Sequence, residues 1–483
     1  MIPFQVDRTQ FPIGQGGFHA TVIHLPYNNR RLSMVIDCGG ANEEHRNLLI
    51  NGFAESGRQH DILVISHFDE DHINGVDDLH TAGIRFETVF LPHVDIQSYL
   101  LWMTLKISAC DEKEAKDLAR VVRIAGRLYG GNYGHVVLVG PQSLASREPQ
   151  PGDLSEDANL ADMLSDEAYK AIQKARGVPG QVFSCSQSLN MKNIDWLFRF
   201  YSREWTFPHE VEDIWNLSFF AKLKAVVDRT KQKLNDSEWG KFATDLELEL
   251  KAKIAPADAD QVMTLTSTTT AKKSIPLKSL KKLKDEIKNG KNGGLSCKCV
   301  LSQLYIHSVS LKDYNDASLC VYSGPALRGT GARREQFSRS VQLGRRDLRL
   351  RPDSLDGVRT REVGWIATGD SDFSTWQKLQ DFLKHYHTET ILTSVFVLPH
   401  HGSRNSYDEH MDRLRELIAN LSEKPLFIAP ANPEHKTYHH PHWQVESTCR
   451  KDGNFYIVDQ ELSSFYLESV YTSDDLSKLI IWK

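Results

Sequence analysis

The feature that most constrains this chain is a cluster of histidines and carboxylates at the end of an apolar run. Residues 61–65 have the length and apolar character of a buried strand, and the next residues read Ser-His-Phe-Asp-Glu-Asp-His. Imidazoles and carboxylates pack poorly into a core, whereas both bind divalent cations. The sequence therefore predicts a metal site at a strand end. A metal ion can make hydroxide available at neutral pH, which indicates a hydrolase.

Length and composition limit the alternatives. A chain of 483 residues exceeds the usual size of one core, so we expect one large domain with an insertion, or two domains. Its 40% hydrophobic and 25% charged residues are ordinary for a soluble protein. We expect no membrane segment and no signal peptide, because the chain has no apolar run of about 20 residues. Seven cysteines, an odd number, favour a cytoplasmic protein without a disulfide framework.

Hydrophobic patterning predicts an α/β chain. We expect a helix at 43–58, mostly helical and polar sequence at 95–310, and strands at 19–25, 32–36, 61–66, 88–91, 300–309, 317–322, 363–370, 391–398 and 426–429. Gly14, Gly16 and Gly17 indicate a tight turn or a close approach of two backbones. The segment 264–294 is rich in Lys, Thr and Gly, which predicts a mobile linker or an arm with a short basic helix.

Chemically active side chains recur where the predicted strands end. These positions are Asp37, the cluster 67–72, Asp370, the pair His400 and His401, and His440. Strand ends of one layered α/β domain can meet at a single rim. We therefore expect these residues to converge on one site.

In this order the motifs resemble the metallo-β-lactamase superfamily, whose signature is His-x-His-x-Asp-His followed by single ligands. More narrowly, the chain resembles the hydrolase domain of ComEC-type DNA-uptake proteins, through segments 67–72, 315–318, 369–370, 400–403 and 440–441. The resemblance covers about residues 10–95 and 300–470 and excludes the membrane channel of those proteins. It implies an αββα sandwich built from 1–95 and 300–483. The rest would be a large, mostly helical insertion at 96–299 and an Arg-rich loop insertion at 324–361.

The resemblance also implies two divalent metal ions, Zn²⁺ or Mn²⁺. It assigns to the first ion His67, Asp69 and one or both of His400 and His401, and to the second ion Asp71, His72 and His440. Asp370 would bridge the ions, and Asp37 would hold the motif loop from behind. Asp69 stands where the broad superfamily has histidine, which favours a harder ion such as Mn²⁺.

Purely structural roles remain open for single members of this set. Asp69 or Asp71 could cap a helix, and Asp37 or Asp370 could be a strand-end turn residue. His442 is the alternative to His440. His93 is a candidate for a further ligand, although it could equally be a surface residue.

We expect a nuclease or phosphodiesterase that uses a two-metal-activated hydroxide. Asp71 or Asp370 would orient the hydroxide, and His442 would protonate the leaving oxygen. The alternatives are hydrolysis of a lactone, thioester or β-lactam, and a non-catalytic, metal-stabilised binding or sensor module. Roles in bacterial defence and in nucleic-acid processing both fit this pattern.

The run 324–361 holds ten arginines and four acidic residues between two strands of the expected site. Such a run can follow a phosphate backbone, which predicts nucleic-acid binding. The alternative is a solvated surface loop. The arginines chosen as substrate-binding residues are Arg333, Arg334, Arg345 and Arg346. The helical insertion is the expected contact for any protein partner.

Overall fold

The computed structural model describes residues 3–94, 99–100, 103–104, 112–141, 158–176, 182–204, 213–229, 234–266, 277–289, 295–307, 317–326, 337–344, 360–435 and 439–472. The protein is of the mixed α/β class expected from its sequence, with two large sheets. It divides into two compact units. Unit 1 comprises Met1–His93, Tyr133–Glu204 and Asn315–Lys483, and unit 2 comprises Val94–Asn132 and Trp205–Tyr314.

The first sheet of unit 1 has nine strands in the order β11-β16-β1-β2-β3-β4-β5-β6-β7. Their bounds are β1 Gln5–Gln10, β2 His19–Leu25, β3 Arg30–Ile36, β4 Gln59–Val64, β5 Arg85–Pro92, β6 His135–Gly140, β7 Phe183–Ser184, β11 Ser338–Leu343 and β16 Tyr466–Tyr471. Strands β3 to β7 pair in parallel, so their carboxyl ends share one edge.

The second sheet has seven strands in the order β15-β14-β13-β12-β10-β9-β8. Their bounds are β8 Ser188–Asn190, β9 Leu197–Tyr201, β10 Cys320–Gly324, β12 Gly364–Ala367, β13 Thr393–Val397, β14 Leu426–Pro430 and β15 Asn454–Val458. Strands β12 to β15 are parallel, and each is joined to the next by a helix.

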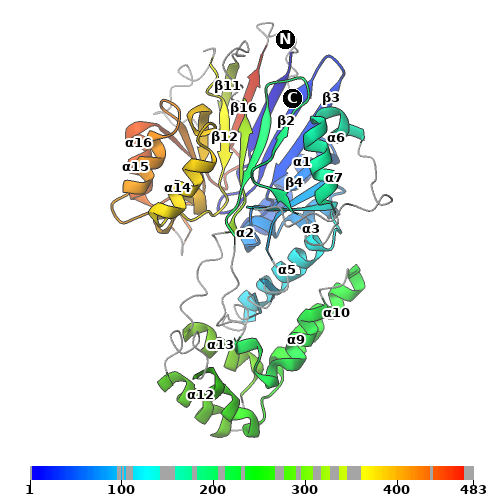
Figure 1. Ribbon diagram of the computed structural model, residues 1–483, viewed down its shortest axis with the longest axis vertical. Helices are drawn as coiled ribbons and strands as arrows, with labels where there is room; N and C mark the ends of the chain where they lie inside the picture. The colour runs from blue at the N-terminus through cyan, green and yellow to red at the C-terminus, as the bar shows by residue number, and fades with distance from the viewer. Residues whose placement is uncertain are drawn as a thin grey trace. The chain divides into compact units, whose positions relative to one another are not determined.

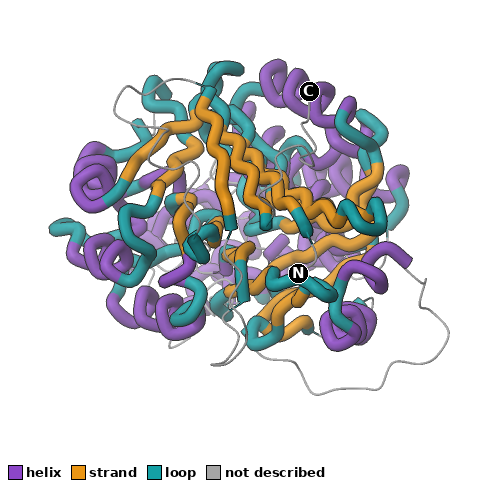
Figure 2. The backbone as a smooth tube through the Cα atoms, turned by 90° about the horizontal axis from the view of Figure 1, so that it is seen from above, coloured by secondary structure: helices purple, strands orange, loops and turns teal. Residues whose placement is uncertain are grey.

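The two sheets share one hydrophobic core, because residues of both belong to the same buried cluster. Ile36 and Val64 of the first sheet lie in it together with Val321, Trp365 and Val395 of the second. Helices cover the sheets on the outside (Figures 1 and 2). The helices of unit 1 are α1 Glu43–Glu55, α2 Glu70–Ile73, α3 Val76–Thr81, α6 Ala158–Met163, α7 Asp166–Ala175, α14 Trp376–His385, α15 Asp412–Ala419 and α16 Trp443–Asp452.

Helices α14, α15 and α16 pack in a row on the second sheet, where each buries an apolar stripe against the strands. Phe382, Leu414 and Val445, one from each helix, share a second cluster with Phe396 and Phe427 of the strands. Each of these helices connects two neighbouring parallel strands. Their amino-terminal ends therefore lie at the carboxyl edge of that sheet.

Unit 2 is helical in the part of the chain that the structure describes. Its elements are α5 Glu112–Tyr129, η1 Ser218–Phe220, α9 Ala221–Asp228, α10 Asp236–Lys251, η3 Pro256–Thr266, α12 Leu277–Asn289 and α13 Cys297–His307. Trp239 of α10 packs against Gly126 of α5, where an added Cβ would lie only 1.8 Å from the indole ring. None of the described helices is long and apolar enough to cross a membrane.

Three expectations about elements need correction. Residues 300–309 were expected to form a strand, but helix α13 covers Cys297–His307. The second error concerns 95–310, where strands β6 to β9 were not expected. They pair with β5 and β10 of the two large sheets, so residues 133–204 group with unit 1 rather than with a helical segment 96–299. Similarly, strand β11 lies within the expected loop 324–361 and pairs with β16.

Candidate metal centre

Four strands of unit 1 end at the candidate site, two from each sheet. Strand β3 is followed by Asp37 and β4 by the segment 66–72, whereas β12 is followed by Asp370 and β13 by the pair His400 and His401. A backbone hydrogen bond from Leu319 N, just before β10, to Ser66 O joins the two sheets here, and one from His400 N to Gly369 O joins the loops that follow β13 and β12. The expected convergence of strand ends thus occurs in the structure.

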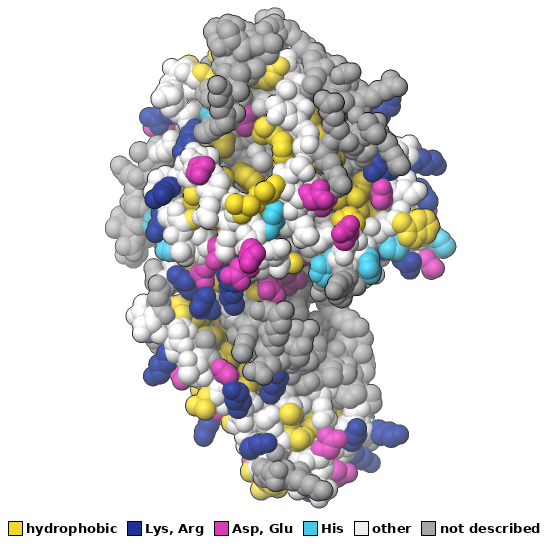
Figure 3. Space-filling model, turned by 180° about the vertical axis from the view of Figure 1, so that it is seen from behind, with side chains coloured by type: hydrophobic (Ala, Val, Ile, Leu, Met, Phe, Trp, Pro, Cys, Tyr) yellow, Lys and Arg dark blue, Asp and Glu magenta, His cyan; other side chains and the backbone are white. Residues whose placement is uncertain are grey.

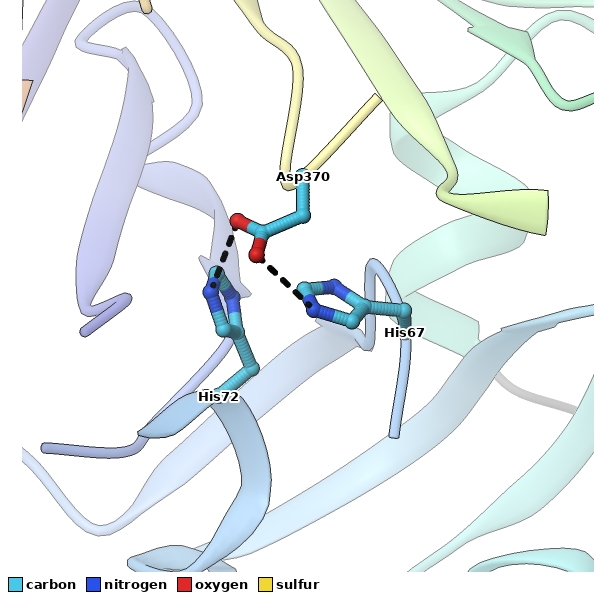
Figure 4. A group of neighbouring side chains, drawn as sticks. All are labelled: His67, His72 and Asp370. Carbon is cyan, nitrogen blue, oxygen red and sulfur yellow. Dashed lines mark ion pairs between the residues drawn. The ribbon is translucent and has the colours of Figure 1, made fainter. Parts of the chain in front are cut away.

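The first group consists of His67, His72 and Asp370, all buried, with one ligand atom of each within 4.8 Å of the others. The Asp370 carboxylate lies between the two imidazole rings (Figure 4). Its Oδ2 is 3.6 Å from His67 Nε2, and its Oδ1 is 3.3 Å from His72 Nε2. One carboxylate thus faces two imidazoles through different oxygens, as a bridging ligand would.

The second group consists of Asp71, His72 and His401 and meets the same distance limit. Asp71 Oδ2 lies 3.0 Å from His401 Nε2, and Asp370 Oδ1 lies 3.8 Å from the same nitrogen. The side chains of the consecutive histidines His400 and His401 occupy different positions. His401 is buried beside Asp71, on the side expected for the second ion, whereas His400 remains 31% exposed, with Nε2 3.9 Å from Asp370 Oδ2.

The atoms that face the centre of the site lack hydrogen bonds. His67 Nε2, His72 Nε2, His401 Nε2 and Asp370 Oδ1 are all buried without a hydrogen bond of regular geometry, although His401 Nε2 lies 3.0 Å from Asp71 Oδ2. Burying an unsatisfied polar atom costs about 1–3 kcal/mol. A cation bound among these atoms would remove the cost at all four positions, so the donor set fits a divalent metal ion.

Asp37 holds the motif loop from behind. Its Oδ1 accepts a hydrogen bond from Ser66 N at 2.7 Å, and its Oδ2 accepts one from Ser66 Oγ at 2.6 Å. The same Oδ2 is 2.8 Å from His72 Nδ1. This contact occupies Nδ1 and directs Nε2 of the ring toward Asp370, as the outer partner of a metal-binding histidine does.

Glycines let the motif loop approach its neighbours closely. Gly17 N donates to Asp71 O, and Gly39 N donates to Gly17 O. A Cβ on Gly17 would lie 2.9 Å from both Asp37 Cβ and His72 Nδ1, and one on Gly39 would lie 2.5 Å from the Asp71 carbonyl carbon. The close backbone approach expected of the early glycine cluster is therefore confirmed.

Several residues of the site have left-handed backbone conformations. Asp37, His400 and His401 have φ values of 56°, 49° and 57°. Such conformations are unfavourable for residues with a Cβ and concentrate at functional sites. In addition, Asp69 occupies the N-cap position of α2 but makes no capping hydrogen bond with its side chain. Helix capping therefore does not account for this carboxylate, whose Oδ2 lies 3.7 Å from His67 Nε2.

The charges of the site are strongly coupled. Burial opposes charge on both His72 and Asp370. The carboxylates of Asp370 and Asp37 nevertheless outweigh burial and hold the pKa of His72 well above its usual value. In turn, His400, His67 and His72 hold the pKa of Asp370 well below its usual value, against the effect of burial. The pocket therefore favours anionic carboxylates opposite a positive charge, which a metal ion would supply.

His440 and His442 lie at the exposed side of the site. The His440 ring is 5.6 Å from that of His400, so it stands beside His400 rather than in the group of Asp71 and His72. Burial, together with His401 and His400, lowers the pKa of His440 to about 4. His442 caps α16, since its Nδ1 accepts a hydrogen bond from Gln444 N at 3.3 Å. This capping role was not predicted from the sequence.

Other expected residues lie away from the site or outside the described residues. The following expected residues lie outside the described residues: Asn315, Asp316, Arg333, Arg334, Arg345 and Arg346. His93 follows β5, and its side chain packs against Gly140. Ser66 lies at the site but was not singled out from the sequence. Its hydroxyl is 3.0 Å from His67 Nδ1.

With this geometry established, the chain was compared with known proteins. No model of a known protein family matches it. A search of curated proteins also finds no match. The assignment of a function therefore depends on the residues of the site itself.

Proposed function

We propose that this protein is a metal-dependent hydrolase with the αββα sandwich of the metallo-β-lactamase type, acting on phosphodiester bonds. The observation that carries the proposal is the convergence of four buried, unsatisfied ligand atoms from separate strand ends. The arrangement of two sheets around a shared core, with the site at their carboxyl edges, supports the fold. The proposed helical insertion corresponds most closely to unit 2.

Two divalent ions are proposed to bind here. His67, His72 and Asp370 would hold one, and Asp71 and His401 would complete the other, with Asp370 shared. Zn²⁺ and Mn²⁺ both suit imidazole and carboxylate ligands. When bound, such ions lower the pKa of water and stabilise negative charge on the oxygens of a phosphodiester.

The chain itself would position the reactants. Contact with His401 and His72 outweighs burial and holds the pKa of Asp71 well below its usual value, so its carboxylate is ionised at neutral pH. Asp71 or Asp370 can therefore accept a hydrogen bond from the attacking water and orient it. His442 is the proposed proton donor to the leaving oxygen. A His442→Ala variant with the metal content and turnover of wild type would exclude this role.

The proposal is tested by cleavage assays with Zn²⁺ or Mn²⁺ on single- and double-stranded DNA, on RNA and on a small phosphodiester. Wild type should cleave at least one of these substrates, and Asp71→Ala should reduce the rate at least about 100-fold. Asp166→Asn is the matched control, because this carboxylate is 78% exposed on α7. Bound metal without turnover on any of these substrates would favour the binding or sensor module instead.

A further inference from the structure

Two exposed tryptophans of unit 1 occupy equivalent places in the fold. Among the described tryptophans, Trp196, Trp215, Trp239 and Trp365 are at most 2% exposed, whereas Trp376 is 49% and Trp443 is 70% exposed. Each of the exposed pair is the first residue of a helix, α14 or α16. An exposed indole is costly to leave in water, so two at corresponding positions call for a partner.

Both helices begin at the carboxyl edge of the second sheet, where Asp370 and the histidine turn also lie. Helix α14 begins six residues after Asp370, and α16 begins three residues after His440. The segment before Trp443 packs on the histidine turn, since His442 N donates to Gly402 O at 3.0 Å. A Cβ on Gly402 would lie 2.8 Å from Pro441 Cβ. The backbone just before Trp443 is therefore held against the turn that carries His400.

Helix α15 packs against both α14 and α16. Two helix-packing steps of 8–10 Å place the axes of α14 and α16 roughly 16–20 Å apart. The turn that carries His400, His401 and Arg404 follows β13, the strand between β12 and β14, and precedes α15. An extended ligand that touches both rings would thus cross the metal site.

The described loop segments that lead into and out of α14, α15 and α16 carry little positive charge. In the described loop segments 368–376, 398–412, 431–435 and 439–446, the only lysine or arginine is Arg404. Arg404 is exposed and lies 3.4 Å from Gln444 of α16 through Nη1 and Oε1. Figure 3 shows histidine side chains reaching the surface together beside hydrophobic groups. A ligand bound at this rim would be recognised more by stacking on aromatic rings than by ion pairs with a charged phosphate backbone.

We propose that Trp376 and Trp443 are base-stacking residues that hold a single-stranded polynucleotide across the metal centre, with Arg404 on a phosphate between them. The inference rests on the proposed phosphodiesterase function and names its substrate class. Unpaired bases can stack on exposed aromatic rings, whereas the base faces of a duplex are covered by their neighbours. Duplex ends and small phosphodiesters would lack this contact.

The test is fluorescence anisotropy with labelled, hydrolysis-resistant phosphorothioate strands. The probes are single-stranded DNA, single-stranded RNA, a blunt duplex and an abasic strand of equal length. Trp376→Ala and Trp443→Ala should each weaken binding of the DNA or RNA strand roughly 5- to 150-fold, the range for one stacked base. Trp443→Phe should retain most of the affinity. The salt dependence should be shallow, with a slope of about −0.7 for one phosphate contact.

Tyr27→Ala is the matched control. Tyr27 is 51% exposed on the turn before β3, at the opposite end of that strand from Asp37, and its loss should leave binding unchanged. Wild-type affinity in both tryptophan variants, or an equal loss on the abasic strand, would overturn the inference. If wild type turns over substrate and the tryptophan variants bind the strands as tightly as wild type, only the stacking role is excluded. Absence of metal and turnover in wild type would remove the proposed function instead.

Discussion

His72 Nδ1 lies 2.8 Å from Oδ2 of Asp37, a residue 35 positions earlier in the chain. The contact joins the ends of β3 and β4 and settles which nitrogen of His72 faces the candidate metal centre. Asp37→Asn should therefore lower the affinity for Zn²⁺ or Mn²⁺ about 10- to 100-fold, as measured by competition with a chelating dye. Asp61→Asn is the control, because Asp61 likewise accepts bonds from a serine, Ser33, but away from the site. Equal losses in the two variants would contradict the role of Asp37.

Gly17 is the point where the glycine loop and the motif loop are closest. Gly17→Ala would place a Cβ 2.9 Å from His72 Nδ1 and push the ring away from Asp37, so metal affinity should fall at least about tenfold. Gly52→Ala in α1 meets no atom within 4 Å and should instead stabilise the protein by about 0.5–1 kcal/mol. Metal titration and thermal unfolding of both variants check the pair. If Gly17→Ala keeps the metal affinity of wild type, the glycine loop can move to accommodate the added Cβ without displacing the metal-binding side chains.

Glu468 neutralises two buried arginines at the core of unit 1. It contacts Arg8 at 2.9 Å and also pairs with Arg339, and all three residues are at most 5% exposed. Glu468→Gln would leave buried positive charge unpaired and should lower the free energy of unfolding by about 3–5 kcal/mol in urea. Arg415→Gln breaks an exposed pair with Asp412 and should cost at most about 1 kcal/mol. Similar small losses in both variants would mean that the buried cluster relaxes or admits water.

His19 should make the protein sensitive to acid. Burial, and secondarily the charge of Arg8, lowers its pKa to about 3. The unfolded chain takes up a proton on this residue below about pH 6.5, and the folded chain does not. The free energy of unfolding should therefore fall with decreasing pH between about 6.5 and 3, with a contribution of about 1.4 kcal/mol per pH unit from His19.

Urea unfolding across that pH range measures the effect. His19→Gln can keep the contact with Thr21 but cannot take up a proton, so its stability should depend less steeply on pH than that of wild type. His410→Gln, at an exposed position, is the control and should follow the wild-type curve. An unchanged slope in His19→Gln would show that His19 does not take up the proton in the unfolded chain.

The parts of the site that follow strands of clear pattern could be predicted from the sequence. Strands β3, β4, β12 and β13 have apolar carboxyl-terminal halves and end within three residues of Asp37, His67, Asp370 and His400. Their convergence follows from the shared edge of parallel strands. The separation of His400 from His401 could not be predicted, because it depends on two consecutive left-handed backbone conformations.

The remaining strands could not be inferred in the same way. Strands β7 and β8 cover Phe183–Ser184 and Ser188–Asn190 and are too short for a periodic pattern. β11 lies within an arginine-rich run and is defined by its pairing with β16 more than 100 residues later. Helix α13, Cys297–His307, contains two short apolar runs, 299–301 and 304–306, with β-branched and aromatic residues that suit a strand equally well. Only tertiary contacts decide such segments.

The central claim is that this pocket binds a pair of divalent ions. The most direct measurement is the metal content of the purified chain by inductively coupled plasma mass spectrometry, after reconstitution with Zn²⁺ or Mn²⁺ and removal of free ions. The account predicts two ions per chain in wild type, fewer in Asp370→Asn and an unchanged content in Asp166→Asn. A wild-type chain without bound divalent metal, or an Asp370→Asn variant with full occupancy, would contradict it.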